Sequence, residues 1–226
     1  MKALATLLAV TALSVPAAAH AGPWYVGLGI GQSSTSTDLV SNRESTLINA
    51  TDVSSDFDRN DTAWKAFAGW RLHRNVAVEV NYTDLGKAKL VTNLTGGGVA
   101  PASITLDRKL DGYGIDGLLI APFDPHKLAV FARAGAFRAR LREDATLGGN
   151  IVFTNGDPED RTRHASQDET VFHWGVGADW NFLPNVGVRL EWERFSKVGK
   201  AFAIGGSGTT GEADTDAWMV NVLYRF

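Results

Sequence analysis

The 226-residue sequence lacks cysteine, a surplus of positive charge and, beyond its N-terminal segment, any long apolar run. Without cysteine the chain can form neither disulfides nor thiolate metal sites or nucleophiles. A formal net charge of −3 does not indicate a nucleic-acid partner. No segment after the N-terminal one approaches the roughly 18 consecutive apolar residues that a transmembrane helix needs. A disulfide scaffold, a thiol enzyme and a helical membrane protein are therefore excluded.

The N-terminal segment has the pattern of a secretory signal peptide. Met1 and Lys2 supply a positive start, residues 3–15 are apolar, and the small-residue pattern "AHA" ends at Ala21. The apolar run is short for a membrane span, so a retained anchor is the weaker alternative. We therefore expect export, with residues 1–21 removed and residues 22–226 forming a single domain.

Apolar residues then recur at every second position, which is the pattern of half-buried β-strands. In "VFHWGVGADWNF", for example, Phe, Trp, Val and Ala alternate with His, Gly and Asp. Eight segments show this alternation, near residues 24–32, 62–72, 76–82, 112–121, 128–137, 171–182, 186–195 and 218–226. An even number of such segments favours antiparallel strands that run up and down.

The connections between these segments alternate between short and long. The short ones lie near residues 73–75, 122–126 and 184–185. The long ones are rich in Ser, Thr, Asn, Asp and Gly, as loops are; they cover residues 33–61, 86–109, 143–168 and 196–214. Short turns at one end and long loops at the other predict an all-β fold, an eight-stranded antiparallel up-and-down barrel.

The apolar face of these strands is expected to point outward, into lipid. All seven tryptophans lie on the apolar set of positions. The interior of an eight-stranded barrel is only just wide enough for side chains, so it cannot hold seven indoles, whereas the opposite face of glycines and charges fits inside. A soluble ligand-binding barrel would need the reverse arrangement. The sequence therefore predicts a transmembrane barrel with periplasmic turns and four long extracellular loops.

Several stretches resemble those of OmpA-like and opacity-type outer-membrane β-barrel proteins. They are "GPWYVGLGIG", "VAVEVNYTDLG", "VGVRLEW" and the final "YRF", and the resemblance covers essentially residues 22–226. It implies a monomeric barrel in the outer membrane of a Gram-negative-type bacterium. The peptidoglycan-binding domain of full-length OmpA is not expected, because the sequence ends with the barrel. The resemblance implies a non-catalytic role in envelope integrity and surface contacts.

Six ionisable residues are expected at one level of the lumen, namely Glu79, Asp116, Arg133, Asp179, Arg189 and Glu191. Buried charges are costly unless they pair with each other or with trapped water. The resemblance implies an interior salt-bridge network in which Glu79, Asp179, Arg189 and Glu191 match acidic and basic positions, with Asp116 standing where a basic residue is expected. Acids outnumber bases here, so Lys65 or a proton is expected as a further partner. An ion gate that re-pairs and a structural plug both remain open, and a filled interior favours the plug.

Three arginines on the fifth strand, Arg138, Arg140 and Arg142, share the outward parity of its alanines. Counted from the periplasmic turn, they lie above the apolar band, at about 25 Å or more. Arginine binds phosphate oxygens bidentately, so these residues predict contact with lipopolysaccharide. A solvated ladder paired with Glu143 and Asp144 is the equally weighted alternative.

Enzymatic chemistry and cofactor binding are poorly supported. His164, Ser166 and Glu169 are the types used by small outer-membrane lipid A deacylases, but a triad needs mutual geometry and this segment is expected to be a loop. Residues 56–61 begin like a calcium loop yet lack its glycine and its final glutamate. We therefore expect no catalytic residue, no metal and no cofactor.

The C-terminal strand is expected to pair with the first, because an open edge cannot survive in hydrocarbon. Tyr224 and Phe226 also resemble the signal that the β-barrel assembly machinery reads. Besides that machinery, the expected partners are outer-membrane lipid, lipopolysaccharide, and host or environmental ligands bound through the loops. A small ion-conducting pore or a lipid-modifying barrel enzyme is the alternative function.

Overall fold

The computed structural model describes residues 23–37, 52–96, 99–124, 127–149, 159–199 and 213–226. The expected signal peptide at residues 1–21 lies outside these ranges. No helix within them is long and apolar enough to cross a membrane. The strands are β1 (Trp24–Thr37), β2 (Asp52–Asp58), β3 (Asn60–His73), β4 (Val76–Gly96), β5 (Val99–Asp124), β6 (Leu128–Gly149), β7 (Thr162–Asn181), β8 (Val186–Val198) and β9 (Ala213–Arg225).

These nine segments form the predicted eight-stranded barrel, because β2 and β3 are two parts of one strand. Only Arg59 separates them, and both pair with β4, β2 with its upper part and β3 with its lower part. Every neighbouring pair is antiparallel, and the ring runs from β1 through β3, β4, β5, β6, β7 and β8 to β9, which pairs again with β1. The predicted fold class is therefore confirmed.

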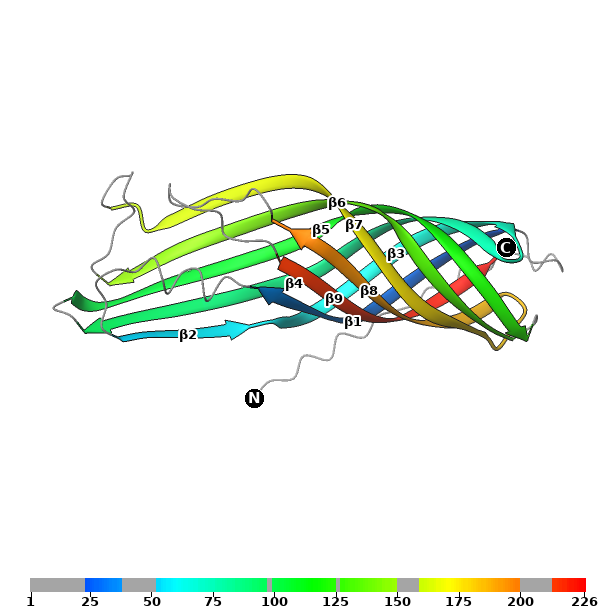
Figure 1. Ribbon diagram of the computed structural model, residues 1–226, viewed down its shortest axis with the longest axis horizontal. Helices are drawn as coiled ribbons and strands as arrows, with labels where there is room; N and C mark the ends of the chain where they lie inside the picture. Colours follow the sequence, from blue (N-terminus) through cyan, green and yellow to red (C-terminus); the bar gives the residue numbers. More distant parts are fainter. Residues whose placement is uncertain (1–22, 38–51, 97–98, 125–126, 150–158, 200–212) are drawn as a thin grey trace, which may run out of the picture.

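Strand β9 closes the barrel against β1, as expected for the C-terminal strand. Ile30 lies opposite Val220, and the backbone N–H of Phe226 donates to the carbonyl of Trp24 at 3.1 Å. In Figure 1 the blue β1 and the red β9 run side by side, and the C-terminus lies at the end with the short turns. The chain end is thus held by the sheet and does not fray.

The two faces of each strand separate as the alternation predicted. On β9, Trp218 and Val220 are 59% and 52% exposed, whereas Met219 and Asn221, which alternate with them, are buried. Outside, aromatic rings form two belts near the ends of the apolar band. Trp24 stacks on Trp70 at 5.4 Å in the lower belt. In the upper belt the ring contacts join Trp64, Tyr82 and Tyr113, and separately Trp174, Trp192 and Trp218.

Glycines on the inner face leave room for large side chains in the narrow lumen. A Cβ at Gly69 would lie 2.1 Å from the Cζ atom of Tyr25, and one at Gly27 would lie 2.2 Å from the Cζ atom of Phe67. The bare inner face of β1 and β3 is therefore a packing requirement of the rings opposite.

Five neighbouring strands continue far beyond the rest of the barrel, namely the strand made of β2 and β3 and the four strands β4 to β7. β4 has 21 residues, β5 has 26, β6 has 22 and β7 has 20, against 14 for β1 and 13 for β8. Figure 1 shows them projecting past the ends of β1, β8 and β9. At roughly 3.3 Å per residue and a tilt near 45°, 26 residues exceed the ~25 Å apolar band more than twofold.

This extension corrects the predicted loop boundaries. Much of residues 86–109 and 143–168 is strand, as is part of residues 33–61. A β-bulge hid the pattern: the β4–β5 register shifts between Asp84 and Lys87, and Gly86 has a φ of 77°. The inward positions of β4 consequently change from odd to even numbers, which interrupts the alternation in the sequence.

Candidate functional site

The lumen is layered along the barrel axis, and β6 shows the layers most simply. Its inward side chains run from Phe131, through Arg133, to Phe137 and Leu141, all of them buried. The same order recurs on β5, where Ile120 and Leu118 are followed by Asp116 and then by Leu110, all of them buried. The charged layer therefore lies between two apolar layers.

The six predicted lumen charges do lie together in this layer. Each is at most 2% exposed: Glu79 on β4, Asp116 on β5, Arg133 on β6, Asp179 on β7, and Arg189 and Glu191 on β8. Strands far apart in sequence bring them together because the ring closes. The burial of every member means that the layer is stable only if each charge finds a partner.

Arg133 is the hub of the layer. Its Nη1 atom lies 3.0 Å from Glu191, 2.7 Å from Glu193 and 3.4 Å from Glu79, and its Nη2 atom bonds to Asp116. One guanidinium thus serves four carboxylates. Arginine suits this role because its five N–H donors point in fixed directions.

Arg189 forms the second centre. Its Nε and Nη2 atoms donate to the two oxygens of Asp179 at 2.7 and 3.2 Å, and its Nη1 donates to Glu79 at 2.6 Å. The guanidinium also lies 4.4 Å from the ring centre of Phe131 and 5.1 Å from that of Phe67. Rings around a desolvated guanidinium add cation–π attraction to the ion pairs.

Lys65 supplies the extra cation that the charge balance required. Its Nζ atom lies 3.2 Å from Glu191 and also bonds to Glu193. The sequence reasoning did not include Glu193 or His173 in the network, although both have inward parity. His173 Nε2 lies 2.5 Å from Asp116 Oδ1.

Neutral groups complete the layer, and sequence reasoning missed them as well. The hydroxyl of Tyr25 donates to Glu79 at 2.7 Å, the amide of Asn81 donates to Asp116 at 2.7 Å, and that of Asn221 donates to Glu191 at 2.9 Å. Inward parity was the available signal for all three. Their chemistry alone does not distinguish them from other polar residues of the strands.

Apolar side chains close the lumen on both sides of the charges. Towards the short turns the closing cluster is Tyr25, Phe67, Ala77, Leu118, Ile120, Ala129, Phe131 and Leu223. Towards the long strands its core includes Phe137, Phe195, Leu141, Val171 and Met219. Phe137 and Phe195 meet edge to face at 4.8 Å. Among the residues that the structure describes, apolar side chains therefore pack the lumen above and below the charge layer.

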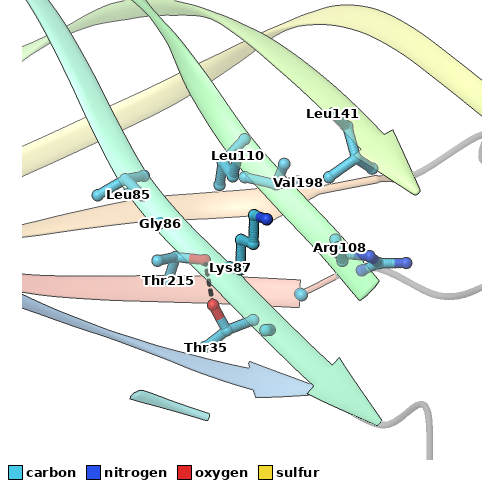
Figure 2. A pocket seen from close by; sticks show the side chains of 11 residues that line it. Thr35, Leu85, Gly86, Lys87, Arg108, Leu110, Leu141, Val198 and Thr215 are labelled. Carbon is cyan, nitrogen blue, oxygen red and sulfur yellow. Dashed lines mark hydrogen bonds between the residues drawn. The ribbon is translucent and has the colours of Figure 1, made fainter. Parts of the chain in front are cut away.

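Small spaces remain at the extracellular end of the lumen. Figure 2 shows the side chains that line one of them, a cavity of about 20 Å³. Two of these side chains, Thr35 and Thr215, share a hydrogen bond between their hydroxyls at 3.1 Å. Arg108 lines the cavity and bonds to Glu143 at 3.1 Å. A water molecule needs about 10–15 Å³ of such space, so this cavity has no room for a larger solute.

The three outward arginines of β6 have partners other than those predicted. Glu143 faces inward and Asp144 bonds to His164, so the solvated ladder with Glu143 and Asp144 is wrong. The cause is the strand register, which places β5 and β7 side chains beside each arginine. Arg140 pairs with Asp168, and Arg142 pairs with Asp111.

The arrangement around His164 does not assemble the triad that was weighed for catalysis. His164 and Ser166 point outward, whereas Glu169 has the opposite parity and accepts a bond from the backbone of Gly199. His164 Nδ1 lies 2.6 Å from Asp144. The segment is a strand and not the predicted loop, because it continues the β6–β7 pairing.

Tyr224 and Phe226 lie at the short-turn end of β9. Their rings meet edge to face at 5.2 Å, and Tyr224 pairs in register with Val26 and Val186. They thus belong to the lower aromatic belt. A role as an assembly signal stays a prediction.

A closed antiparallel ring with an apolar exterior between two aromatic belts and a charged, packed interior defines an integral outer-membrane β-barrel protein. The family assignment agrees: the model of the outer membrane protein beta-barrel domain matches residues 5–226, and the chain belongs to this family. The predicted OmpA-like resemblance and the outer-membrane location are confirmed.

The chain is similar to several curated proteins of Gram-negative bacteria. It is 25% identical to Outer membrane protein A of Escherichia fergusonii over all of its own length and 56% of the relative's. It is 28% identical to Outer membrane protein P5 of Haemophilus influenzae, covering 88% of this chain and 54% of the relative's. The chain thus spans about half the length of the curated relatives it matches.

Two solved structures share the fold at low sequence identity. Neisserial surface protein A matches with a TM-score of 0.54 and 14% identity, covering 91% of this chain and 98% of the other. Ail, the attachment invasion locus protein of Yersinia pestis, matches with a TM-score of 0.51 and 14% identity, covering 91% and 99%. At this identity the likeness concerns the fold alone.

Proposed function

We propose that this barrel is a sealed structural and surface-interaction element of the outer membrane, without catalytic chemistry. The observation that carries the proposal is the layered lumen, in which a charge network lies between two apolar layers. A porin needs a continuous aqueous path, and eight strands enclose too little space for one once the side chains are packed.

Opening a path would require two separate rearrangements. Arg133 would have to leave carboxylates at 2.7, 3.0 and 3.4 Å while all of them are buried. In addition, the contact between Phe137 and Phe195 would have to open. Uncompensated buried charge costs several kcal/mol, so a transient ion path through this layer has a high barrier.

The interaction part of the proposal concerns the long strands. β4 to β7 extend beyond the apolar band and carry outward polar and charged side chains, including exposed Arg140, Asp144 and Asp168. Surface segments held by a rigid scaffold are well suited to binding partners. Envelope contacts, host contacts or both would be made here, while the sealed barrel provides the anchor.

Planar lipid bilayer recordings test the sealed state. Purified barrel, first shown to be folded by its altered gel mobility without heating, should give no large, stable conductance after insertion. A large and stable open conductance from folded protein would refute the plug. Mass spectrometry of lipid A from cells with and without the protein should show no difference, and a new lipid A species would overturn the non-catalytic assignment.

A further inference from the structure

The three outward arginines of β6 differ in how far their charge is already satisfied. Arg142 bonds to Asp111, and this hydrogen bond together with the carboxylate charge raises the pKa of Arg142, which lies above the upper belt. Arg140 is 3.6 Å from Asp168, and both side chains are about half exposed. For Arg138 the only partner among the described residues is the hydroxyl of Thr170, at 3.4 Å.

Arg138 lies at the boundary between the apolar band and the polar rim. In the register it is opposite Tyr113 of β5 and Thr170 of β7, and the next outward residue below it, Ala136, is opposite Phe172. Its neighbours therefore place it at the height of the upper aromatic belt. The outward face of β6 carries no aromatic ring at this height and Arg138 is exposed, so the arginine is accessible from the lipid side.

Below Arg138 the outward residues of β6 are the exposed alanines Ala136, Ala134 and Ala132, and a groove on the outer surface begins at Ala132. It has a volume of about 590 Å³, and its lining includes Val130, Ala132, Val176, Ala178 and Trp192 from β6, β7 and β8. Ala132 lies six positions below Arg138 on the same strand face. At about 2.4 Å of height per tilted residue, the separation is roughly 14 Å, which an acyl chain spans.

We propose that Arg138 and Arg140 bind the phosphate of an outer-leaflet lipid whose acyl chain lies in this groove. Charge complementarity selects the occupant. Arg138 has no carboxylate partner in the described part of the chain, Arg140 has an exposed one at 3.6 Å, and phosphate accepts bidentate bonds from guanidinium. Arg142 holds Asp111 and fixes the upper end of the site. The lipid A portion of lipopolysaccharide combines the required phosphate and acyl chains.

Lipid binding to folded barrel in detergent, followed by native mass spectrometry, tests this proposal. The probes are bis-phosphorylated lipid A, the same lipid A without its phosphates, and inorganic phosphate. The double variant Arg138→Gln/Arg140→Gln should bind bis-phosphorylated lipid A about tenfold more weakly or worse, as expected for losing charge-assisted bonds. Lipid A without phosphates should bind the wild-type barrel with a similar loss.

The matched control removes two positive charges from β4, which also rises above the band. The variant Lys87→Gln/Lys89→Gln, in which both side chains are exposed, should bind bis-phosphorylated lipid A like the wild type. An equal loss in this control would reduce the effect to general surface charge and overturn the site. Ala132→Trp, which fills the groove, should weaken binding while both arginines remain.

Three other results would also contradict the proposal. Unchanged binding by the arginine double variant would remove the head-group contact, and unchanged binding by Ala132→Trp would remove the acyl-chain contact. Displacement of lipid A by inorganic phosphate would indicate a simple anion site without a lipid groove. Heat-dependent gel mobility of every variant shows whether it is folded before binding is compared.

Discussion

Replacing Arg189 by methionine tests whether the lumen network holds the barrel together. The substitution keeps an unbranched side chain among Phe131, Phe67 and Tyr25, but removes the guanidinium. Asp179 then loses two hydrogen bonds and Glu79 loses one of 2.6 Å. Both carboxylates stay buried.

The expected loss of unfolding free energy depends on the partners that Asp179 and Glu79 retain. Removing one partner of a buried ion pair costs about 3–5 kcal/mol. Asp179 retains Arg225 at 3.4 Å, and Glu79 retains Arg133 at 3.4 Å and the hydroxyl of Tyr25 at 2.7 Å. These remaining partners place the expected loss at the lower end, about 3 kcal/mol of unfolding free energy.

Urea unfolding of the barrel in lipid vesicles, followed by tryptophan fluorescence and gel mobility, measures this loss. Arg194→Met is the matched control on the same strand, because Arg194 binds Asp216 through two bonds of 2.7 and 2.8 Å on the outer side, where it is partly exposed. An exposed pair contributes about 1 kcal/mol or less. Equal effects of the two substitutions, or a loss below about 1 kcal/mol for Arg189→Met, would refute the buried network as a stabilising element.

Three further changes test other parts of the structure. Gly69→Ala places a Cβ 2.1 Å from the ring of Tyr25 and should cost about 1–3 kcal/mol in the same unfolding assay, and a neutral result would show that the ring moves freely. Deleting Phe226, which removes its bond to Trp24, should lower the amount of folded barrel in the outer membrane more than Lys127→Ala does, and wild-type assembly would argue against the proposed signal. Phe137→Ala/Phe195→Ala opens the upper apolar layer and should still give no large conductance while the charge layer is intact; a stable pore would place the seal in these rings alone.

The fold could be predicted because alternation, tryptophan placement and connection lengths all point to one architecture. Period-two runs define strands whatever surrounds them, and seven indoles cannot enter so narrow a barrel. The inward charges followed from the same parity, which is why Glu79, Arg133 and Arg189 could be named as neighbours. Their hydrogen-bond partners could not be named. The bond from Arg189 of β8 to Glu79 of β4, for example, depends on how the ring closes.

The predicted loop boundaries and the predicted arginine partners were wrong because both depend on strand register, which the local sequence pattern does not show. The bulge at Gly86 changes the inward parity of β4, so that the upper part of the strand looks like a polar loop. Arg142 bonds to Asp111, which lies 31 positions away in the sequence, and only the β5–β6 register brings them together. Glu143 seemed a suitable partner by proximity, yet neighbouring residues of a strand face opposite sides.

The lumen charges also determine the register, which an apolar lumen could not do. A one-residue slip of a strand exchanges its two faces completely. If β8 slipped in this way, Arg189, Glu191 and Glu193 would all face lipid, where an arginine costs about 2–4 kcal/mol at the midplane and less towards the interfaces. With apolar residues on both faces, the slipped and correct pairings would differ only in packing. The buried network therefore favours the observed register of β8 with β7 and β9 over registers shifted by one residue. The glycines of the inner face leave the room that so large a charged cluster needs.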